Sequence, residues 1–304
     1  MKNSEKNKLL VIIVTYNAMQ WAEHCFDSLR TSTINLDVFV VDNGSTDGTQ
    51  EYVQKHYPEV IFHQSKENLG FGKANNIGLQ YAIENNYDYV YLLNQDAWVM
   101  PETFERLMTL SKQYPEYGVL SPFQMNADMM HIDRNFVVYV MSWDSNSDIT
   151  NDLFNHNLKD IYPVSEIMAA HWFMTKECIL KVGGFSPSFP HYNEDGNYAD
   201  RMHFWGLKLG VIPSLRVVHD RGWREDTDKK KMHLQYTSSI RLMSNPDSSK
   251  SDSFLKIIFK EVANVITYKS LLPLSYLWKL IIQKCAIEKY KLISVSGTCA
   301  FLKH

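Results

Sequence analysis

The first half of the chain alternates short β-branched or aromatic runs with segments of helical periodicity, and this alternation constrains the fold more than any other feature of the sequence. The runs predict strands over residues 9–16, 37–42, 60–64 and 87–94. The segments between and after them predict helices over 19–30, 46–57, 73–85 and from Pro101 to about 113. Repeated strand–helix units build a mostly parallel sheet flanked by helices, so an α/β fold is expected.

The second half returns to this order after residues 125–163, which have little periodicity and one expected strand near 136–141. Beyond them we expect a strand over 166–174, a short helix over 176–181, a helix to about 210 and a last strand that ends at His219. The α/β pattern therefore extends to about residue 224, with one half over 9–124 and another over 125–224.

The C-terminal region, residues 225–304, is chemically different from the rest. The whole chain has a net charge of -3, but residues 251–304 hold eight lysines and three acidic residues, a balance of +5 that leaves -8 elsewhere. After a linker-like stretch over 245–253, apolar residues recur at helical spacing with lysines between them, which is typical of helices at a membrane surface. The alternative is a helical pair packed on the main domain with a solvated lysine face.

Charge and cysteine usage exclude several classes of protein. The overall acidic balance argues against nucleic-acid binding through a basic surface. The four cysteines have neither disulfide-framework nor zinc-site spacing. The apolar stretch after the polar N-terminus is too short for a signal peptide, and residues 271–287 are interrupted by Pro273, Lys279 and Lys284, which disfavours a membrane span. A cytoplasmic protein is expected.

Polar side chains follow three of the expected strands directly. Ligands of open parallel sheets bind beyond the carboxyl ends of the strands, so these residues are the first candidates for a site. They are Thr15, Tyr16 and Asn17 after the first strand, Asp42 and Asn43 after the second, and Asn94, Gln95 and Asp96 after the fourth.

Two of these residues are carboxylates at strand ends. Asp96 is a candidate ligand for a hard divalent cation that also binds phosphate oxygens, and Asp42 could accept hydrogen bonds from a base or a ribose. Each also has a simpler interpretation, because aspartate is common in turns and at helix starts. The glycine-rich segment 68–78 enters a helix and carries Lys73, a combination that favours an anion, although it matches neither a dinucleotide-binding nor a Walker fingerprint.

A third group of candidates lies in the second half. Glu194 and Asp195 open a helix, and Arg201 follows two turns later on roughly the same face. One carboxylate could act as a general base, or the pair could simply cap the helix. His219 ends the last apolar strand and could complete a metal site with Asp96, although an isolated strand-end histidine is more often structural.

The motifs V-T-Y-N, V-D-N-G-S-T-D-G, E-N-L-G-F-G-K-A-N-N-I-G, L-L-N-Q-D, G-G-F, N-E-D and V-V-H occur in this order between residues 9 and 222. In this order they resemble the family 2 glycosyltransferases, and the rhamnosyltransferase-like members most. The resemblance covers roughly seven tenths of the chain and does not reach the C-terminal region. It implies a GT-A type, Rossmann-like fold with a C-terminal helical appendage, and an inverting single displacement.

The resemblance also implies roles for individual residues. Thr15, Tyr16 and Asn17 would line the nucleotide pocket, with Asp42 on the base or ribose. Asp96 matches the second acid of the family's DXD metal motif, Asp195 matches the catalytic base, and His219 matches a histidine that often joins the metal shell. The remaining donor-site candidates are Asn43, Lys73, Asn75, Asn94, Gln95 and Arg201, with Glu194 as the second catalytic carboxylate. The implied cofactor is Mn²⁺ or Mg²⁺, and the implied donor is a dTDP- or UDP-sugar.

Two positions depart from the family pattern: Asn94 replaces the first acid of DXD, and Asn197 replaces the last acid of E-D-x-D, whose role would be lost or would pass to Asp200. The expected acceptor is a carbohydrate or a lipid-linked glycan, with peripheral membrane contact through the C-terminal region at the inner face of the cytoplasmic membrane. One alternative is a non-catalytic sugar-nucleotide-binding or scaffolding subunit. Another is a nucleotidyltransferase, but residues 16–21 lack the Gly- and Arg/Lys-rich signature it would need.

Overall fold

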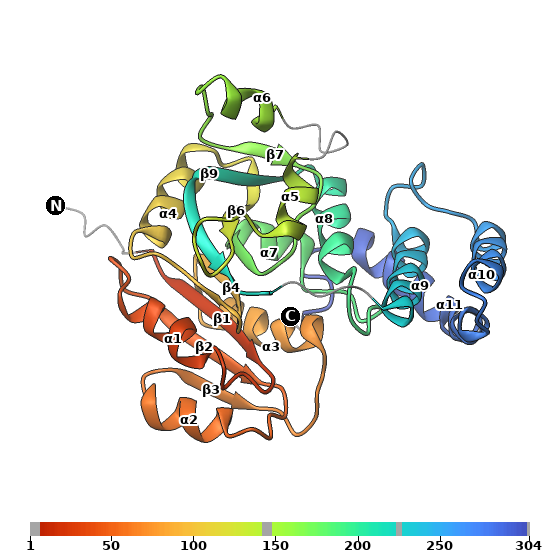
Figure 1. The fold of residues 1–304 in the computed structure, drawn as a ribbon, viewed down its shortest axis with the longest axis horizontal. Coiled ribbons are helices and arrows are strands. Elements are labelled where there is room, and N and C mark those ends of the chain that lie inside the picture. Colours follow the sequence, from red (N-terminus) through yellow and green to blue (C-terminus); the bar gives the residue numbers. More distant parts are fainter. Residues whose placement is uncertain (1–6, 142–147, 223–226, 303–304) are drawn as a thin grey trace.

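The structure, a computed structural model, describes residues 7–141, 148–222 and 227–302 (Figure 1). The described residues form a nine-stranded sheet in the order β3-β2-β1-β4-β8-β6-β9-β5, and β7 pairs with β9 beside this path. The strands are β1 (Leu9–Thr15), β2 (Asp37–Asp42), β3 (Ile61–Gln64), β4 (Tyr89–Asn94), β5 (Ala97–Trp98), β6 (Tyr117–Met125), β7 (Tyr162–Val164), β8 (His171–Thr175) and β9 (Lys208–His219).

The parallel part of the sheet confirms the predicted α/β fold. Strands β3, β2, β1 and β4 are parallel neighbours, and the register pairs Thr15 with Asp42 and Val14 with Asn94. The carboxyl ends of β1, β2 and β4 therefore lie level at one edge. Strand β8 runs antiparallel between β4 and β6, whereas β6 and β9 are parallel to each other.

Helices cover the sheet and continue into a separate C-terminal group (Figure 1). Along the first 222 residues the helices are α1 (Ala22–Arg30), α2 (Thr49–His56), α3 (Phe71–Glu84), α4 (Thr103–Gln113), α5 (Arg134–Met141), α6 (Ile149–Phe154), α7 (Lys176–Val182) and α8 (Glu194–Phe204). The C-terminal helices are α9 (Asp228–Ser244), α10 (Phe254–Tyr268) and α11 (Leu272–Ser296).

Several predictions of secondary structure differ from the structure. Residues 136–141, expected as a strand because of their β-branched residues, belong to helix α5, whose first turn is fixed by Asp133 Oδ1 accepting a hydrogen bond from Phe136 N at 2.8 Å. Strand β6 was not predicted, because Pro122 interrupts its apolar run at a register shift opposite β9. The helix expected to reach residue 210 ends at Phe204, and Gly206 follows with a φ of 76°.

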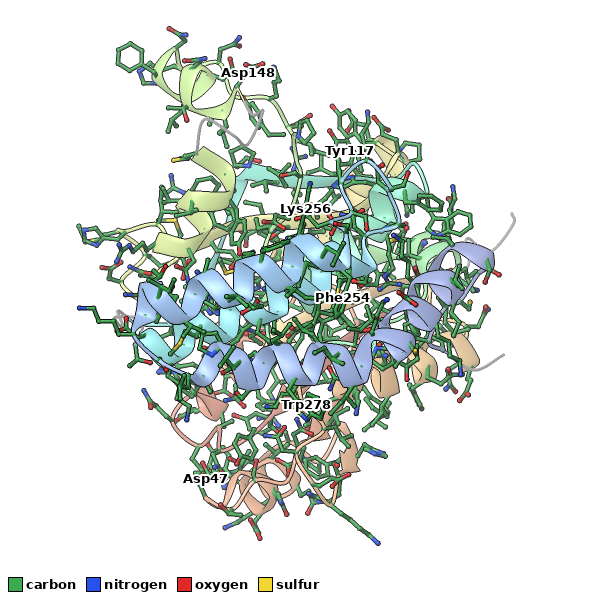
Figure 2. All side chains as sticks on the ribbon, turned by 90° about the vertical axis from the view of Figure 1, so that its right-hand side faces the viewer. Asp47, Tyr117, Asp148, Phe254, Lys256 and Trp278 are labelled. Atoms are coloured by element: carbon green, nitrogen blue, oxygen red, sulfur yellow. The ribbon has the colours of Figure 1, made fainter. Side chains whose placement is uncertain are left out.

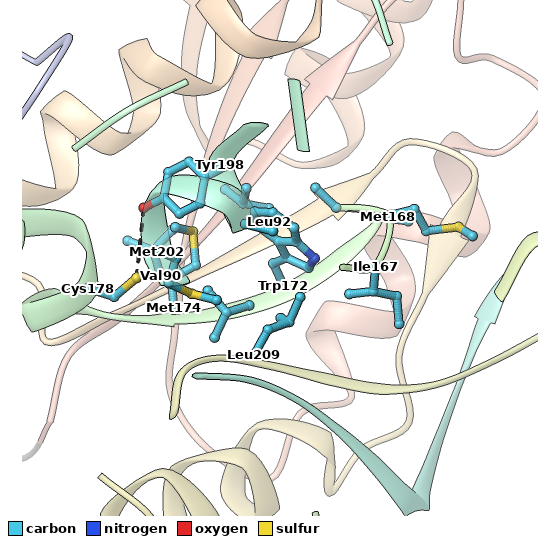
Figure 3. Packing of buried hydrophobic residues seen from close by; sticks show 14 of the residues in the cluster. Val90, Leu92, Ile167, Met168, Trp172, Met174, Cys178, Tyr198, Met202 and Leu209 are labelled. Atoms are coloured by element: carbon cyan, nitrogen blue, oxygen red, sulfur yellow. Dashed lines mark hydrogen bonds between the residues drawn. The ribbon is translucent and has the colours of Figure 1, made fainter. Parts of the chain in front are cut away.

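Strand β1 supplies apolar side chains to both faces of the sheet because successive side chains of a strand alternate. Leu10 and Ile12 belong to the cluster on the side of α3, α7 and α8, whereas Leu9, Val11 and Ile13 join the cluster beneath α1 and α4. Figure 3 shows the centre of the first cluster, where Trp172 packs among aliphatic side chains and Cys178 Sγ lies 3.9 Å from Tyr198 Oη. The sheet is therefore buried on both faces.

The C-terminal helices pack on one another and on α8. Met232, Tyr236 and Ile240 of α9 share a buried cluster with Tyr276 and Leu280 of α11. The chain then returns to the main domain, where Cys299 N donates to Leu180 O and Gly184 N donates to Ala300 O, each at 2.7 Å. None of the helices in the described ranges is both long enough and apolar enough to span a bilayer.

Helix α3 lies against β1 so closely that only glycine fits at the contact. A Cβ atom at Gly78 would lie 2.7 Å from Ile12 Cγ2, well inside van der Waals contact. We expect Gly78→Ala to lower the free energy of unfolding by about 1–3 kcal/mol, because the added methyl group must displace a buried side chain. Urea unfolding measures this change.

Gly297→Ala is the matched control, since no atom lies within 4 Å of a Cβ there and the φ of -168° suits any residue. In an Ile12→Ala background the cost of Gly78→Ala should shrink, because the clashing atoms are gone. Equal costs in both backgrounds would show that the contact with Ile12 is not the cause.

Candidate active site

The carboxyl edge of the sheet brings together most of the residues predicted at strand ends. Gln95 ties the end of β4 to the end of β1, since its Oε1 accepts from Tyr16 N at 2.6 Å and its Nε2 donates to Tyr16 O at 3.2 Å. This pairing fixes the backbone of Tyr16 and leaves its side chain 46% exposed at the edge. Asn94 lies beside it, partly buried.

Asp42 is fully buried and accepts six hydrogen bonds from the chain itself. The donors are Thr15 Oγ1, Gly44 N, Ser45 N and Oγ, Gln50 Nε2 and Gln64 Nε2, at 2.5–3.2 Å. Burial alone would raise the pKa of this carboxyl, but the hydrogen bonds, those of Ser45 first, lower it overall and keep it ionised. Asp42 therefore organises the loop after β2, and direct contact with a base would require Gln50 or Gln64 to release it.

Two asparagines connect the neighbouring loops. Asn17, in the left-handed region with a φ of 52°, accepts from Thr46 N at 2.8 Å. Asn43 donates through Nδ2 to Asn68 Oδ1 at 2.9 Å and accepts from Leu69 N at 2.8 Å. The loops after β1, β2 and β3 thus form one hydrogen-bonded rim.

The start of α3 positions the other predicted donor-site residues. The Lys73 side chain is exposed, whereas Asn75 is buried and donates back to Phe71 O at 3.0 Å within its own helix. Its neighbour Asn76, which was not predicted, binds the segment between α7 and α8. Its Oδ1 accepts a hydrogen bond from Phe185 N at 2.7 Å, and its Nδ2 donates one to Phe185 O at 2.9 Å. The repeated asparagine in the motif was the available signal for this contact.

Asp96 and His219 meet at this edge, as predicted. His219 Nε2 lies 3.6 Å from Asp96 Oδ1, and β5 pairs with β9 so that Asp220 N donates to Asp96 O at 2.7 Å. Burial raises the pKa of Asp96, but His219 and then the charge of Arg221 lower it overall, so the carboxylate stays ionised. The nearby His171 is structural: its Nδ1 lies 2.8 Å from Tyr91 Oη and its Nε2 lies 2.8 Å from Val218 O.

The geometry of this pair fits a shared divalent cation. A separation of 3.6 Å is too long for a hydrogen bond, yet both atoms could contact one cation, because metal–ligand distances are about 2.0–2.2 Å. His219 Nδ1 is buried and has no hydrogen-bond partner in the described ranges, although Asp133 Oδ2 lies 3.7 Å away. No group of three or more His, Cys, Asp or Glu residues in those ranges is placed to hold a metal ion.

Helix α8 begins with the two predicted catalytic carboxylates. Tyr192 and Asn193 precede them with φ values of 68° and 65°, a strained entry that directs the first turn of α8. Burial, and then the adjacent charge of Asp195, raise the pKa of Glu194, whose Oε2 is buried without a hydrogen-bond partner in the described ranges. Burial likewise raises the pKa of Asp195, although Gly196 N donates to its Oδ1 at 2.8 Å.

The side of α8 that faces the C-terminal helices carries an arginine network that the sequence did not reveal. Arg241 of α9 donates to both carboxylate oxygens of Asp200, at 2.7 and 2.9 Å, and also to Glu166. A Cβ atom at Gly196 would lie 2.4 Å from Arg241 Nη1, so the glycine makes room for the guanidinium. Because Arg241 binds Asp200 in this way, Asp200 is not available to replace the missing last acid of the motif.

Arg201 does not take the predicted place at the donor site. It is 1% exposed and donates to Val182 O at 2.9 Å, to Gly184 O at 2.6 Å and to Asn197 Oδ1 at 3.2 Å. Burial lowers its pKa to about 10. The guanidinium therefore joins α8 to the end of α7, and the prediction of donor binding is corrected to a structural position.

The raised pKa of Glu194 makes the stability of the fold depend on pH. Because the folded state holds the proton more tightly than the unfolded chain does, the stabilisation is full below the unfolded pKa and is lost as pH rises through the folded pKa. Above pH 4.5 the free energy of unfolding of the wild type should therefore decrease as pH rises. We expect Glu194→Gln to make this slope shallower by up to about 1.4 kcal/mol per pH unit.

Urea unfolding at several pH values measures that slope. Glu51→Gln is the matched control, because Glu51 also lies in the first turn of a helix but is exposed. Parallel pH profiles for the wild type and Glu194→Gln would contradict the assignment. The Asp195 carboxyl contributes a slope of the same sign, so part of the dependence should remain.

Sequence comparison adds independent information about this chain. Residues 10–164 match the family model described as glycosyl transferase family 2. The chain is 26% identical over 233 residues to the N-acetylglucosaminyl-diphospho-decaprenol L-rhamnosyltransferase of Mycobacterium tuberculosis, covering 70% of this chain and 76% of that protein. It is 32% identical over 242 residues to chondroitin synthase of Escherichia coli, covering 77% of this chain but only 32% of that longer protein.

Solved structures share the fold at low sequence identity. The crystal structure of S. aureus TarS 1-349 has a TM-score of 0.54 at 15% identity, covering 78% of this chain and 65% of that one. The mannosyltransferase PcManGT from Pyrobaculum calidifontis, in complex with GDP-Man and Mn²⁺, has a TM-score of 0.55 at 18% identity, covering 82% and 66%. These likenesses confirm the GT-A type fold. Since the family model matches half of the chain, this protein belongs to glycosyl transferase family 2.

Proposed function

We propose that the chain transfers a sugar from a nucleoside-diphosphate sugar to a hydroxyl group of a carbohydrate or lipid-linked glycan, with inversion at the anomeric carbon. The observation that carries this proposal is the presence of two separate acidic centres: Asp96, which lies 3.6 Å from His219, and the carboxyl pair Glu194 and Asp195 that begins α8. The pKa of Asp96 is lowered beside His219, whereas the pKa values of Glu194 and Asp195 are raised. The first suits cation binding and the second suits proton transfer.

The donor would bind along the rim formed after β1, β2 and β3. Asp96 and His219 would hold a Mn²⁺ or Mg²⁺ ion, which when bound neutralises charge on the diphosphate. Arg221 adds a cationic group here, because its charge lowers the pKa of Asp96 and also acts on Tyr139, a neighbour of Asp195. Uridine and thymidine donors are the candidate classes.

Asp195 would act as the general base. Its carboxylate accepts the proton of the acceptor hydroxyl while that oxygen forms a bond to the anomeric carbon, and the bond from this carbon to the diphosphate oxygen breaks on the opposite face. A base with a raised pKa takes the proton more effectively near neutral pH. Glu194, protonated in the same pH range, avoids a second buried negative charge beside it.

The rhamnosyltransferase relative supports a narrower proposal about the substrates. Its name specifies an L-rhamnosyl group and a diphospho-decaprenol acceptor, so rhamnose is the candidate sugar here and a lipid-linked glycan the candidate acceptor. An enzyme that uses such an acceptor would work in the cytoplasm, in peripheral contact with the inner face of the membrane through the C-terminal region. Cell-surface polysaccharide synthesis is the corresponding process.

Donor binding is tested by calorimetry with UDP, dTDP and GDP, each with and without Mn²⁺ or Mg²⁺. We expect one nucleotide to bind in a metal-dependent manner, and Asp96→Ala to weaken it at least about tenfold, roughly 1.4 kcal/mol. Asp88→Ala is the matched control, because Asp88 precedes β4 at the opposite edge of the sheet from Asp96. Absence of binding under all conditions would reject the donor site.

The role of Asp195 is tested by turnover with the nucleotide sugar that binds. We expect Asp195→Asn to lower kcat by about 10²–10⁴-fold, because the base is removed while the side-chain shape is kept. Nucleotide binding should stay within about twofold of the wild type, since Asp195 is assigned to the acceptor side. Near-wild-type turnover in this variant would move the base to Glu194.

A further inference from the structure

The outer faces of α10 and α11 form an apolar surface that nothing in the described structure covers. Six large side chains define this α10–α11 surface: Leu255, Phe259 and Ile266 on α10, Leu271 directly before α11, and Trp278 and Ile282 on α11. Each is between 63% and 78% exposed. Figure 2 views the molecule from this side, with the two helices next to each other and Phe254, Lys256 and Trp278 labelled.

The surface is not part of an incomplete core. On α10, Leu255, Phe259 and Ile266 lie on one side of the helix, whereas Ile257, the opposite side, is 1% exposed and packs toward α9 and α11. On α11, Tyr276 and Leu280 fill the same buried cluster. Both helices therefore bury one apolar side within the protein and present a second apolar side outward, which is unusual for a surface facing water.

The charges around this surface indicate what it contacts. Residues 251–304 carry a balance of +5 while the rest of the chain carries -8, so positive charge is concentrated in the segment that also carries the exposed apolar side chains. Lys256 pairs with Asp252 at 3.2 Å and Lys284 with Glu288 at 3.8 Å. Lysines interleaved with exposed aromatic and aliphatic side chains match the chemistry of an anionic lipid surface.

We propose that α10 and α11 dock side by side into the interfacial layer of an anionic bilayer, with the apolar surface inserted and the lysines at the lipid head groups. Trp278 would lie at the level of the head groups, where indole rings are favoured. Neither helix can span a bilayer, which is consistent with both lying in its plane. A second copy of the chain is a less suitable partner, because it would bring two regions of +5 together.

Docking would also orient the active site. Helix α9 packs against α11 and α10 on one side and against α8 on the other, and Arg241 fixes α9 to Asp200 of α8. The helix that begins with Glu194 and Asp195 is thus held one helix layer from the membrane. This consequence rests on the proposed function, because it supposes that Asp195 acts on a lipid-linked acceptor near the head groups. The docking of α10 and α11 does not rest on the proposed function.

Co-sedimentation of the full chain with vesicles tests the docking. We expect binding to vesicles that contain phosphatidylglycerol, weaker binding to pure phosphatidylcholine, and further weakening at high salt. The double variant Phe259→Ser/Trp278→Ser should bind at least about tenfold more weakly, because two inserted aromatic side chains are lost. Phe154→Ser is the matched control, since Phe154 is 86% exposed but lies on α6, away from this surface.

Two further measurements separate the possible failures. Analytical ultracentrifugation without vesicles measures the oligomeric state. A wild-type dimer that the double variant converts to monomers, together with no vesicle binding by either protein, would overturn the proposal. Equal vesicle binding by the wild type and the double variant would also overturn it. Metal-dependent nucleotide binding by the double variant should equal that of the wild type. Nucleotide binding and vesicle binding therefore distinguish failure of the donor site from failure of the docking.

Discussion

The buried carboxylate of Asp42 is the interaction on which the active-site edge depends. An ionised carboxyl group is costly to bury unless hydrogen bonds compensate, and here six of them do. The donors come from β1, from the loop after β2, from α2 and from β3, so one side chain fixes four segments that are distant in sequence. The positions of Tyr16 and Asn17 follow from this arrangement. The chain's own hydrogen bonds therefore hold this edge of the sheet in place.

A second constraint holds the catalytic helix from both sides. Arg201 joins the inner side of α8 to the carbonyl groups of Val182 and Gly184, and Arg241 joins its outer side to α9. Removing either arginine would leave buried hydrogen-bond acceptors without a donor, which typically costs about 1–3 kcal/mol for each acceptor, so neither contact is a minor one. The C-terminal helices are consequently more than an appendage. Through Arg241 and Gly196 they help to determine where Asp195 lies.

The parallel half of the fold could be predicted because its signals are local. Hydrophobic periodicity marks β1 to β4 and their helices, and parallel pairing then brings Asp42 and Asp96 to one edge. Residues 136–141 were misassigned because valines favour strands, although Asp133, three residues before Phe136, is a local helix-start signal that caps the helix.

Long-range side-chain contacts lie outside what periodicity can predict. Arg201 does share a helical face with Glu194, but two turns separate them, and that distance puts the arginine in the core instead of the donor site. Arg241 contacts Asp200 and Glu166, which lie 41 and 75 positions before it in the sequence, and no local sequence pattern predicts these contacts. Asp133, beside His219, was missed for the same reason.

The start of α8 shows which of two opposing effects controls the catalytic carboxylates. A helix N-terminus stabilises negative charge by about 0.3–1 kcal/mol, which by itself would lower the pKa values of Glu194 and Asp195. Burial acts in the opposite direction and is stronger, because Glu194 Oε2 has no hydrogen-bond donor in the described ranges and the two carboxyl groups are adjacent. The pair therefore retains a proton to a higher pH than an exposed carboxyl group would. Asp96, two residues after the end of β4, keeps its charge because His219 and Arg221 compensate it. The protein thus holds an ionised carboxylate at Asp96 and a carboxyl pair with raised proton affinity at Glu194 and Asp195.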